Sequence, residues 1–270
     1  MAATKKIRSW IKISVAIYIA AGLALYFLQE KIIFHPKKLP PEYNFNFQVP
    51  FKEVNLPVNN DKILNIVQFT VPDSLCRGVV LYFHGNRNNI ERYAPYAVNF
   101  TKNNYEVWMM DYPGFGKSTG PRTEEIMYTD AETVYRLARS RFSKDSIILY
   151  GKSLGTGIAA QLASVKDCKR LVLETPYYSF DALMGHFAFI FPARLMSKYH
   201  FPTHQYLEKV EAPVHIFHGT HDRIIPFSQS TRLKKKFPGV ALIAVKDGRH
   251  NNLSEFDLYH QQLDSLLALP

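Results

Sequence analysis

The chain has 270 residues, of which 47% are hydrophobic and 14% aromatic, a composition that can bury one sizeable core but not two. Its formal net charge is +10, but residues 1–38 contain seven Lys or Arg and one Glu and therefore carry +6 of it. The remaining charge is spread out, since the single basic run, residues 234–236, has the spacing of a solvated helix face. The charge therefore argues against a nucleic-acid partner, and the lack of repeats or low-complexity tracts excludes solenoid and disordered classes.

The first predicted element is an apolar helix over residues 10–29, which follows a basic flank, residues 1–9. At about 1.5 Å per residue it nearly spans a bilayer core of about 30 Å, so we interpret it as a transmembrane anchor. A cleaved signal peptide is the alternative, but no small-x-small cleavage site ends the apolar run. Four Lys or Arg precede or begin the helix and three follow it. This slight bias predicts a single-pass protein with a cytoplasmic N-terminus and an extracytoplasmic domain.

Residues 30–48 are predicted to form a linker ahead of one domain, residues 49–270. Its proline-rich part, residues 34–41, is expected to run along the domain surface without forming an element. In this domain short apolar strands alternate with helical stretches. The strands are expected at residues 52–57, 63–71, 79–83, 107–110, 147–150, 171–173, 214–217 and 242–245, and the helices at 124–141, 154–164, 228–237 and 254–267. Continuous apolar strands suit a sheet covered on both faces, so the pattern predicts an α/β fold with a mainly parallel sheet.

The most informative motif is Gly-x-Ser-x-Gly at residues 151–155, between a predicted strand and a predicted helix. This order is typical of a nucleophile elbow, with Ser153 as the nucleophile. A serine hydroxyl is a weak nucleophile at its ordinary pKa, so it needs an exposing turn and a neighbouring base. We expect Gly151 and Gly155 to leave room for both.

Two polar residues that follow later strands complete the predicted site. Asp222 and His250 come after Ser153 in the order Ser, Asp, His. His250 would take the serine proton while Asp222 orients the imidazole, although Glu174, also at a strand end, is an alternative to Asp222. The backbone N–H groups of Leu154 and Asn86 are the expected donors to an oxyanion.

These motifs together resemble those of the α/β-hydrolase superfamily, in particular its membrane-anchored, hydrolase-domain-containing serine hydrolases. The resemblance covers residues 32–266, and its motifs are residues 34–36, 84–86, 111–118, 151–155, 218–222 and 250–251. It implies an eight-stranded sheet with strand order 1-2-4-3-5-6-7-8. It supports the roles given to Ser153, Asp222 and His250, but it supplies no substrate.

The implied strand order also bears on the two cysteines. Cys76 and Cys168 would precede strands separated by another strand, roughly 10 Å apart at about 4.8 Å per step. That distance exceeds the usual reach of about 7 Å between the Cα atoms of a disulfide. Both are therefore expected to be free thiols.

An insertion at about residues 177–210 is rich in aromatic residues and is expected to form a short helical cap over the site. Phe187 and Phe191 in this cap would either wall an apolar part of a substrate or pack the cap onto the core. Tyr112 and Phe115, in the glycine-containing segment 111–118, are expected to shape the same pocket.

Several other patterns favour ordinary structural roles. His84 is expected to fix the oxyanion loop, and the alternating His215, His218 and His221 face opposite sides of a strand, so no metal site is predicted. The two Gly-Lys-Ser tripeptides lack the preceding glycine of a phosphate loop, which argues against a nucleotide cofactor.

The sequence thus predicts a serine hydrolase that cleaves a carboxylic ester, thioester or related acyl bond through an acyl-enzyme on Ser153, without metal or organic cofactor. The anchor and the apolar cap favour lipid-derived or membrane-proximal substrates. The alternatives are a serine peptidase of the same fold, which needs a site for a peptide terminus, and a membrane-tethered scaffold without turnover, which needs none of the three residues.

Overall fold

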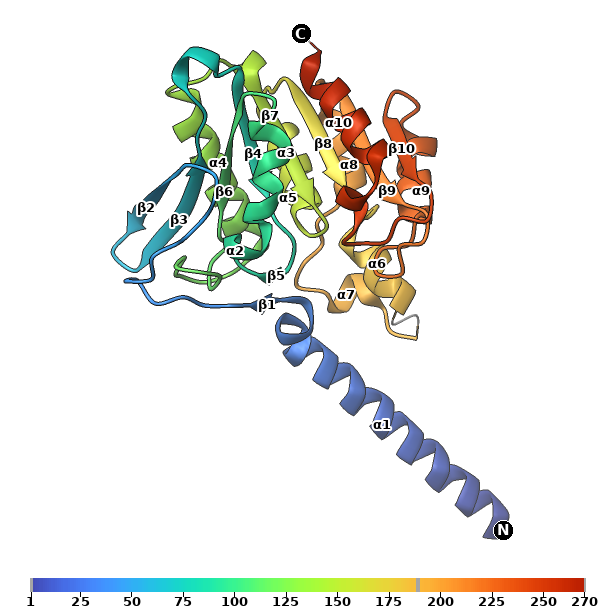
Figure 1. The fold of residues 1–270 in the computed structure, drawn as a ribbon. Coiled ribbons are helices and arrows are strands. Elements are labelled where there is room, and N and C mark those ends of the chain that lie inside the picture. Colours follow the sequence, from blue (N-terminus) through green and yellow to red (C-terminus); the bar gives the residue numbers. More distant parts are fainter. Residues whose placement is uncertain (1, 188–189, 270) are drawn as a thin grey trace.

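A computed structural model describes residues 2–187 and 190–269, and an eight-stranded sheet forms its centre (Figure 1). In chain order its strands are β2 (Phe51–Asn59), β3 (Lys62–Phe69), β4 (Gly78–Phe83), β6 (Tyr105–Met110), β7 (Ile147–Lys152), β8 (Arg170–Glu174), β9 (Val214–Gly219) and β10 (Ala241–Val245). Across the sheet the order is β2-β3-β6-β4-β7-β8-β9-β10. β3 pairs antiparallel with β2 and β6, and the other neighbours are parallel. The predicted strand order is confirmed.

Helices cover both faces of this sheet. One face packs against α4 (Glu124–Arg139), α5 (Gly155–Ala163) and α9 (Ser228–Lys236), and the other against α2 (Ile90–Tyr93), α3 (Val98–Thr101) and α10 (Asp257–Ala268). Neighbouring residues of β4 serve opposite cores, Leu81 the first and Tyr82 the second, because side chains alternate along a strand. The predicted fold class is confirmed. The sequence missed α2 and α3, which are each four residues long, too short to show helical periodicity.

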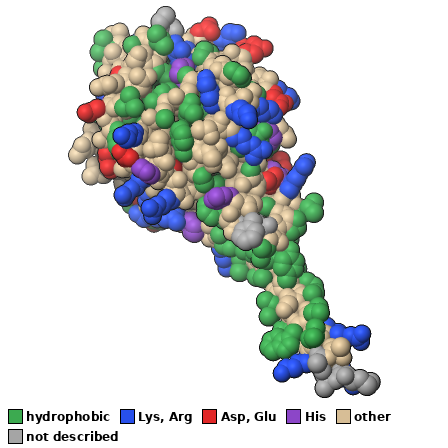
Figure 2. Space-filling model, turned by 90° about the vertical axis from the view of Figure 1, so that its right-hand side faces the viewer, with side chains coloured by type: hydrophobic (Ala, Val, Ile, Leu, Met, Phe, Trp, Pro, Cys, Tyr) green, Lys and Arg blue, Asp and Glu red, His purple; other side chains and the backbone are tan. Residues whose placement is uncertain are grey.

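Helix α1 (Ala2–Ile33) projects from the domain as a rod (Figure 1). Lys and Arg side chains lie at its free end, and hydrophobic side chains cover much of the helix between that end and the domain (Figure 2). Within the described residues, one helical segment, Thr4–Ile33, is long and apolar enough to cross a membrane, a property that a signal sequence shares. The helix continues four residues beyond the predicted end of the anchor at residue 29. The first part of the predicted linker is therefore helical.

The prediction that residues 34–41 form no element is wrong. His35–Pro36 forms strand β1, which pairs in parallel with β5 (Arg87–Asn88). Pro36 disfavours helix at His35 and so ends α1. Phe34 is only 3% exposed and packs on Tyr199 with ring centroids 4.8 Å apart. Burial of this ring and the backbone pairing fix the segment to the domain, and a two-residue strand shows no periodicity that would predict it.

The cap between β8 and β9 contains α6 (Phe180–Phe187), α7 (Ala193–Met196), α8 (Thr203–Tyr206) and the 3₁₀ turn η4 (Leu207–Lys209). α6 and α7 lie beside the C-terminal end of α1 (Figure 1). The Glu124 carboxylate accepts hydrogen bonds from the backbone N–H groups of His200 (2.6 Å) and Phe201 (3.0 Å), which ties the returning chain of the cap to α4. Cys76 and Cys168 are both free thiols, as predicted.

Candidate active site

Ser153 lies at a strained turn between β7 and α5. Its φ is 52°, in the left-handed region that few residues other than glycine adopt. The Ser153 N–H donates to the Glu174 carbonyl (2.9 Å), and its carbonyl accepts from the Thr156 N–H (3.0 Å). Both neighbouring glycines are sterically required, because a Cβ would fall under 3.0 Å from the Gly155 carbonyl at Gly151 and from the Phe83 carbonyl at Gly155. The expected crowding is confirmed.

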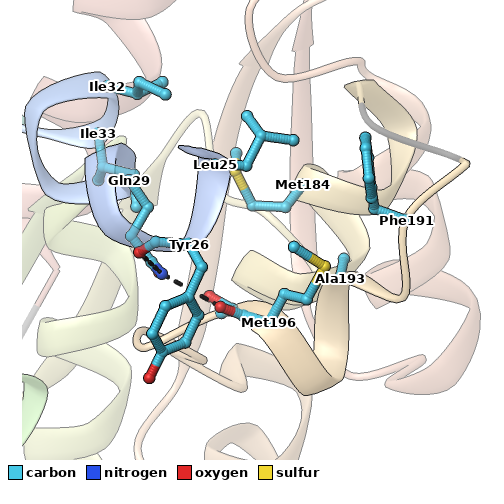
Figure 3. Close-up of a pocket in the computed structure, with 10 residues that line it drawn as sticks. Leu25, Tyr26, Gln29, Ile32, Ile33, Met184, Phe191, Ala193 and Met196 are labelled. Atoms are coloured by element: carbon cyan, nitrogen blue, oxygen red, sulfur yellow. Dashed lines mark hydrogen bonds between the residues drawn. The ribbon is translucent and has the colours of Figure 1, made fainter. Parts of the chain in front are cut away.

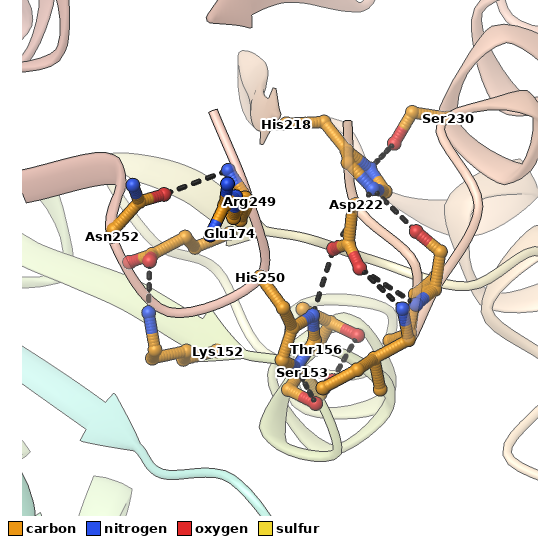
Figure 4. A network of polar contacts seen from close by, with 12 residues as sticks. Lys152, Ser153, Thr156, Glu174, His218, Asp222, Ser230, Arg249, His250 and Asn252 are labelled. Carbon is orange, nitrogen blue, oxygen red and sulfur yellow. Dashed lines mark hydrogen bonds and ion pairs between the residues drawn. The ribbon is translucent and has the colours of Figure 1, made fainter. Parts of the chain in front are cut away.

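The three predicted polar residues meet at this turn (Figure 4). His250 Nε2 lies 3.0 Å from Ser153 Oγ, and His250 Nδ1 lies 2.7 Å from Asp222 Oδ2. Asp222 follows β9 and His250 follows β10, so the parallel strands deliver both to the edge where β7 ends. All three side chains are buried. The arrangement can pass a proton from the serine to an imidazole that a carboxylate holds in place.

The environment of Asp222 keeps it ionised. Burial opposes ionisation, but hydrogen bonds from His218 and His250 and from the Ile225 N–H outweigh it and hold the pKa of Asp222 below its ordinary value. Asp222 Oδ1 also accepts from the Ile224 N–H (2.8 Å). His218, for which no such role was predicted, lies 3.4 Å from Asp222 Oδ2. A histidine four residues before the acid, at a strand end, was the available signal.

Glu174, the alternative to Asp222, is engaged elsewhere. Its carboxylate accepts from Lys152 Nζ (Figure 4). It also accepts from the Tyr150 hydroxyl. This buried pair lies beside the elbow, and the Glu174 backbone carbonyl holds the Ser153 amide. The geometry thus favours Asp222 as the partner of His250.

The loop after β4 carries Asn86 to the same site. Leu154 precedes α5, where the first helical N–H groups have no partner within the helix, so its amide is free to serve a ligand. The Asn86 side chain donates to the Ile33 carbonyl at the end of α1, and the backbone carbonyl of Asn86 accepts from the His35 N–H (2.9 Å).

His84 is fully buried. One ring nitrogen lies 3.2 Å from Asp111 Oδ1 and the other lies 2.7 Å from the Gly85 carbonyl, in keeping with a structural role.

Tyr112 and Phe115 do not line the cavity at Ser153, and this part of the prediction is corrected. Both are fully buried. The Tyr112 hydroxyl donates to the His84 carbonyl (2.7 Å), and the Phe115 ring packs against His84 with centroids 5.5 Å apart. The two aromatic residues therefore support the loop that carries Asn86, because segment 111–118 passes behind that loop and not beside Ser153.

Ser153 opens into an apolar cavity of about 140 Å³. The wall comes from α1, the cap and the loop after Asp222, and it consists of Ile32, Ile33, Asn86, Leu154, Tyr177, Phe180, Leu183, Met184, Phe187, Ile224 and Ile225. Phe187 belongs to this lining. Phe191 lies farther away, where it stacks on Tyr18 of α1 with centroids 4.8 Å apart. The contribution of α1 to this wall was not predicted, because no local sequence pattern indicates it.

The three histidines near β9 separate in space. His218 binds Ser230 and Ile225, His221 is exposed and lies 3.1 Å from Asp247, and His215 is half-buried. Across residues 2–187 and 190–269, no three His, Cys, Asp or Glu side chains form a cluster that could hold a metal ion.

A strained serine between a strand and a helix, at the carboxyl edge of a mainly parallel, doubly covered sheet, defines the α/β-hydrolase class. The chain belongs to the α/β-hydrolase superfamily. The family model described as serine aminopeptidase, S33, matches residues 75–206, a stretch that includes Ser153.

Curated relatives share this class. Alpha/beta hydrolase domain-containing protein 17C of Xenopus tropicalis is 32% identical over 196 residues, which cover 70% of this chain and 60% of that protein. Alpha/beta hydrolase domain-containing protein aho-3 of Caenorhabditis elegans is 31% identical over 197 residues, 70% of this chain and 57% of that protein. The chain thus spans less than two thirds of the length of these relatives.

Solved structures share the fold at lower sequence identity. The esterase Pf2001 of Pyrococcus furiosus superposes with a TM-score of 0.68 at 19% identity, over 87% of this chain and 96% of the esterase. Est1E of Butyrivibrio proteoclasticus, solved with ferulic acid bound, superposes with a TM-score of 0.63 at 17% identity, over 76% of this chain and 94% of Est1E.

Proposed function

We propose that this protein is a serine hydrolase that cleaves a carboxylic ester, thioester or related acyl bond through an acyl-enzyme on Ser153. The hydrogen-bonded chain from Ser153 through His250 to Asp222 carries the proposal, since each distance suits proton transfer or orientation. The apolar wall of the adjoining cavity favours an acyl group that is itself apolar.

In the first half-reaction Ser153 Oγ attacks the carbonyl carbon while His250 Nε2 takes the serine proton. The carbonyl oxygen becomes an oxyanion, to which the N–H groups of Leu154 and Asn86 donate. The bond to the leaving group then breaks, and the leaving oxygen or sulfur takes the proton from His250. In the second half-reaction water attacks the acyl carbon, again with His250 as base, and the acid and free Ser153 result.

We further propose that α1 anchors the protein in a membrane with its N-terminus in the cytoplasm. Its length and exposed apolar surface suit a span, and four Lys or Arg lie near its N-terminal end. Protease added to the outer side of intact membranes should then digest the domain and leave the N-terminal end protected. Digestion only after the membrane is opened would reverse the assigned orientation.

A serine peptidase is the second candidate, favoured by the description of the family model that matches residues 75–206. An aminopeptidase must pair the ammonium group of its substrate, and a buried ammonium needs a carboxylate partner. No Asp or Glu belongs to the described lining of the Ser153 cavity. The lining therefore favours the esterase reaction over the aminopeptidase reaction.

The deciding experiment is labelling of the detergent-solubilised full chain with a fluorophosphonate probe, beside Ser153→Ala and His250→Ala variants. We expect the label to disappear in Ser153→Ala and to weaken strongly in His250→Ala, with circular dichroism unchanged. A folded wild-type protein that takes no label would favour the scaffold. Faster turnover of an aminoacyl p-nitroanilide than of every p-nitrophenyl ester would favour the peptidase.

A further inference from the structure

A second apolar cavity lies between α1 and the cap (Figure 3). Leu25 and Ile32 of α1 face Phe191 and Met196 of the cap across it. Its volume is about 90 Å³. The same two elements carry exposed apolar residues outside its lining, among them Leu28 of α1 and Ile190 of the cap.

This groove adjoins the cavity at Ser153. Three side chains, Ile32, Ile33 and Met184, line both. Each cavity alone is at or below the volume of about 150 Å³ that accommodates a benzene-sized molecule. Together they would take a longer, linear apolar group, and the flexible thioether of Met184 suits the junction between them.

Helix α1 is held firmly enough to form one wall of this groove. Gln29, itself buried, donates from Nε2 to the Met196 carbonyl (3.1 Å) and accepts at Oε1 from the Lys198 N–H (2.7 Å). Farther along the helix the Tyr18 hydroxyl donates to the Ile190 carbonyl (2.9 Å). At about 1.5 Å per residue these contacts extend about 16 Å along α1, from Gln29 to Tyr18.

The position of Tyr18 relates the groove to the bilayer. Residues 15–28 contain no charged side chain, so if α1 spans a membrane Tyr18 lies at the depth of the acyl chains. The tip of the cap, which contacts Tyr18 through Ile190 and Phe191, then reaches the same depth. The far end of the groove therefore opens where lipid tails are found.

The other side of the site is polar. His250 lines a separate cleft of about 860 Å³ together with Arg223, Arg249 and Asn252. Ile224 borders both this cleft and the apolar cavity. An apolar direction and a polar direction therefore meet beside Ser153 and His250, which suits an ester with an apolar acyl chain and a polar leaving group.

We propose that the groove between α1 and the cap binds the acyl chain of a single-chain lipid ester taken from the bilayer, with the ester carbonyl at Ser153 and the polar leaving group in the cleft at Arg249. Helix α1 is then a part of the substrate site as well as an anchor. This inference rests on the proposed serine hydrolase function.

The test compares two substitutions on one helix in the full chain, reconstituted in phosphatidylcholine nanodiscs. Leu25→Trp fills the groove, whereas Leu28→Trp adds the same side chain at a position that is 46% exposed and outside its lining. Rates of labelling are measured with an ethyl and with a dodecyl fluorophosphonate. We expect wild type and Leu28→Trp to prefer the dodecyl probe, and Leu25→Trp to lose this preference by about tenfold, the effect of about two buried methylenes. The rate with the ethyl probe should be equal in wild type and Leu28→Trp, and circular dichroism equal in all three shows that each variant is folded.

The lipid source is tested with monopalmitoylglycerol in the same nanodiscs, whose hydrolysis should slow by a similar factor in Leu25→Trp only. Equal probe preference in Leu25→Trp and Leu28→Trp would overturn the groove assignment while leaving the hydrolase intact. A preference that depends on Leu25 without hydrolysis of monopalmitoylglycerol would overturn the lipid assignment. Failure of wild type to react with either probe would instead overturn the proposed function.

Discussion

At the scale of single residues, Asp222 shows how a buried carboxylate is kept charged. It accepts from His250 and from the N–H groups of Ile224 and Ile225, and His218 Nε2 lies 3.4 Å from Oδ2, so donors replace the water that burial removes from the carboxylate. Because its pKa is lower in the folded than in the unfolded chain, Asp222 adds stability above the unfolded pKa of about 3.9, and that stability is lost as pH falls through the folded value.

We predict that Asp222→Asn lowers the free energy of unfolding at neutral pH by about 1–3 kcal/mol. The side chain of asparagine has an amide nitrogen in place of one carboxylate oxygen, and this nitrogen cannot accept a hydrogen bond from either histidine. Urea titrations should show this difference shrinking as pH falls below about 4. The same change should slow fluorophosphonate labelling. Asp247→Asn, at an exposed carboxylate that pairs with exposed His221, is the control and should leave both measurements unchanged. A difference that grows on acidification would contradict the assigned direction of the pKa shift.

Cys168 offers a second prediction at this scale. Burial raises the pKa of its thiol to about 12, and only the thiolate reacts with alkylating agents. In a Cys76→Ser variant at about pH 8.5, iodoacetamide should therefore leave Cys168 unmodified until the protein is unfolded. Mass spectrometry with and without denaturant measures this. Rapid alkylation of the native variant would show that the thiol is not shielded.

At the scale of elements, the nucleophile elbow depends on how closely β4, β7 and α5 approach. The parallel pairing of β4 with β7 brings the Phe83 carbonyl against Gly155, so that the start of α5 packs directly on the backbone of β4. The motif Gly-x-Ser-x-Gly predicts this turn because the spacing of its glycines reflects the steric requirement.

We predict that Gly155→Ala destabilises the protein by about 1–3 kcal/mol or more, because the added methyl group must displace backbone at Phe83. Gly239→Ala is the matched control. A Cβ there meets nothing within 4 Å, and the change should be neutral or slightly stabilising. Thermal unfolding of both variants measures the difference. Equal melting temperatures would mean that α5 can shift without cost.

Long elements were predictable from the sequence and short ones were not. The eight strands and the helices α4, α5, α9 and α10 all lie where periodicity indicated, with ends that differ by a few residues. β1, β5, α2 and α3 are two to four residues long and form because tertiary contacts hold them. Hydrogen bonds from His35 and Lys37 to the chain near Asn88 show this for β1, which has no sequence pattern of its own.

At the scale of the whole molecule, the boundary between anchor and domain lies within the fold. Ile33 and Phe34 are 5% and 3% exposed, and Arg122 lies over the Phe34 ring at 4.4 Å. The Ile33 carbonyl accepts from Asn86, the residue expected to donate to the oxyanion. Removal of the anchor should therefore spare the site if the chain is cut before Ile33 and Phe34, and should affect the site if these residues are removed as well.

We predict that a chain beginning at residue 31 stays folded, whereas one beginning at residue 39 loses about 3–5 kcal/mol, the usual cost of emptying a buried phenylalanine site. It also loses the pairing of β1 with β5. Urea unfolding of the two fragments gives the comparison, and fluorophosphonate labelling should be slower in the shorter one. Equal stability would mean that Phe34 and β1 are dispensable.

The sequence by itself determined the order of strands and helices along the chain and indicated Ser153, Asp222 and His250 as the candidate catalytic residues. Local patterns indicate both. Apolar periodicity indicates the order of the elements, and polar residues in turns that follow strands indicate the three candidate residues. Only the tertiary structure decided that Tyr112 and Phe115 support a loop, that His218 binds Asp222, and that α1 walls the cavity at Ser153. The physical reason is that such roles depend on which surfaces meet. Gln29 and the Met196 carbonyl, for example, are hydrogen-bonded across 167 positions of the chain, and no local pattern encodes that contact.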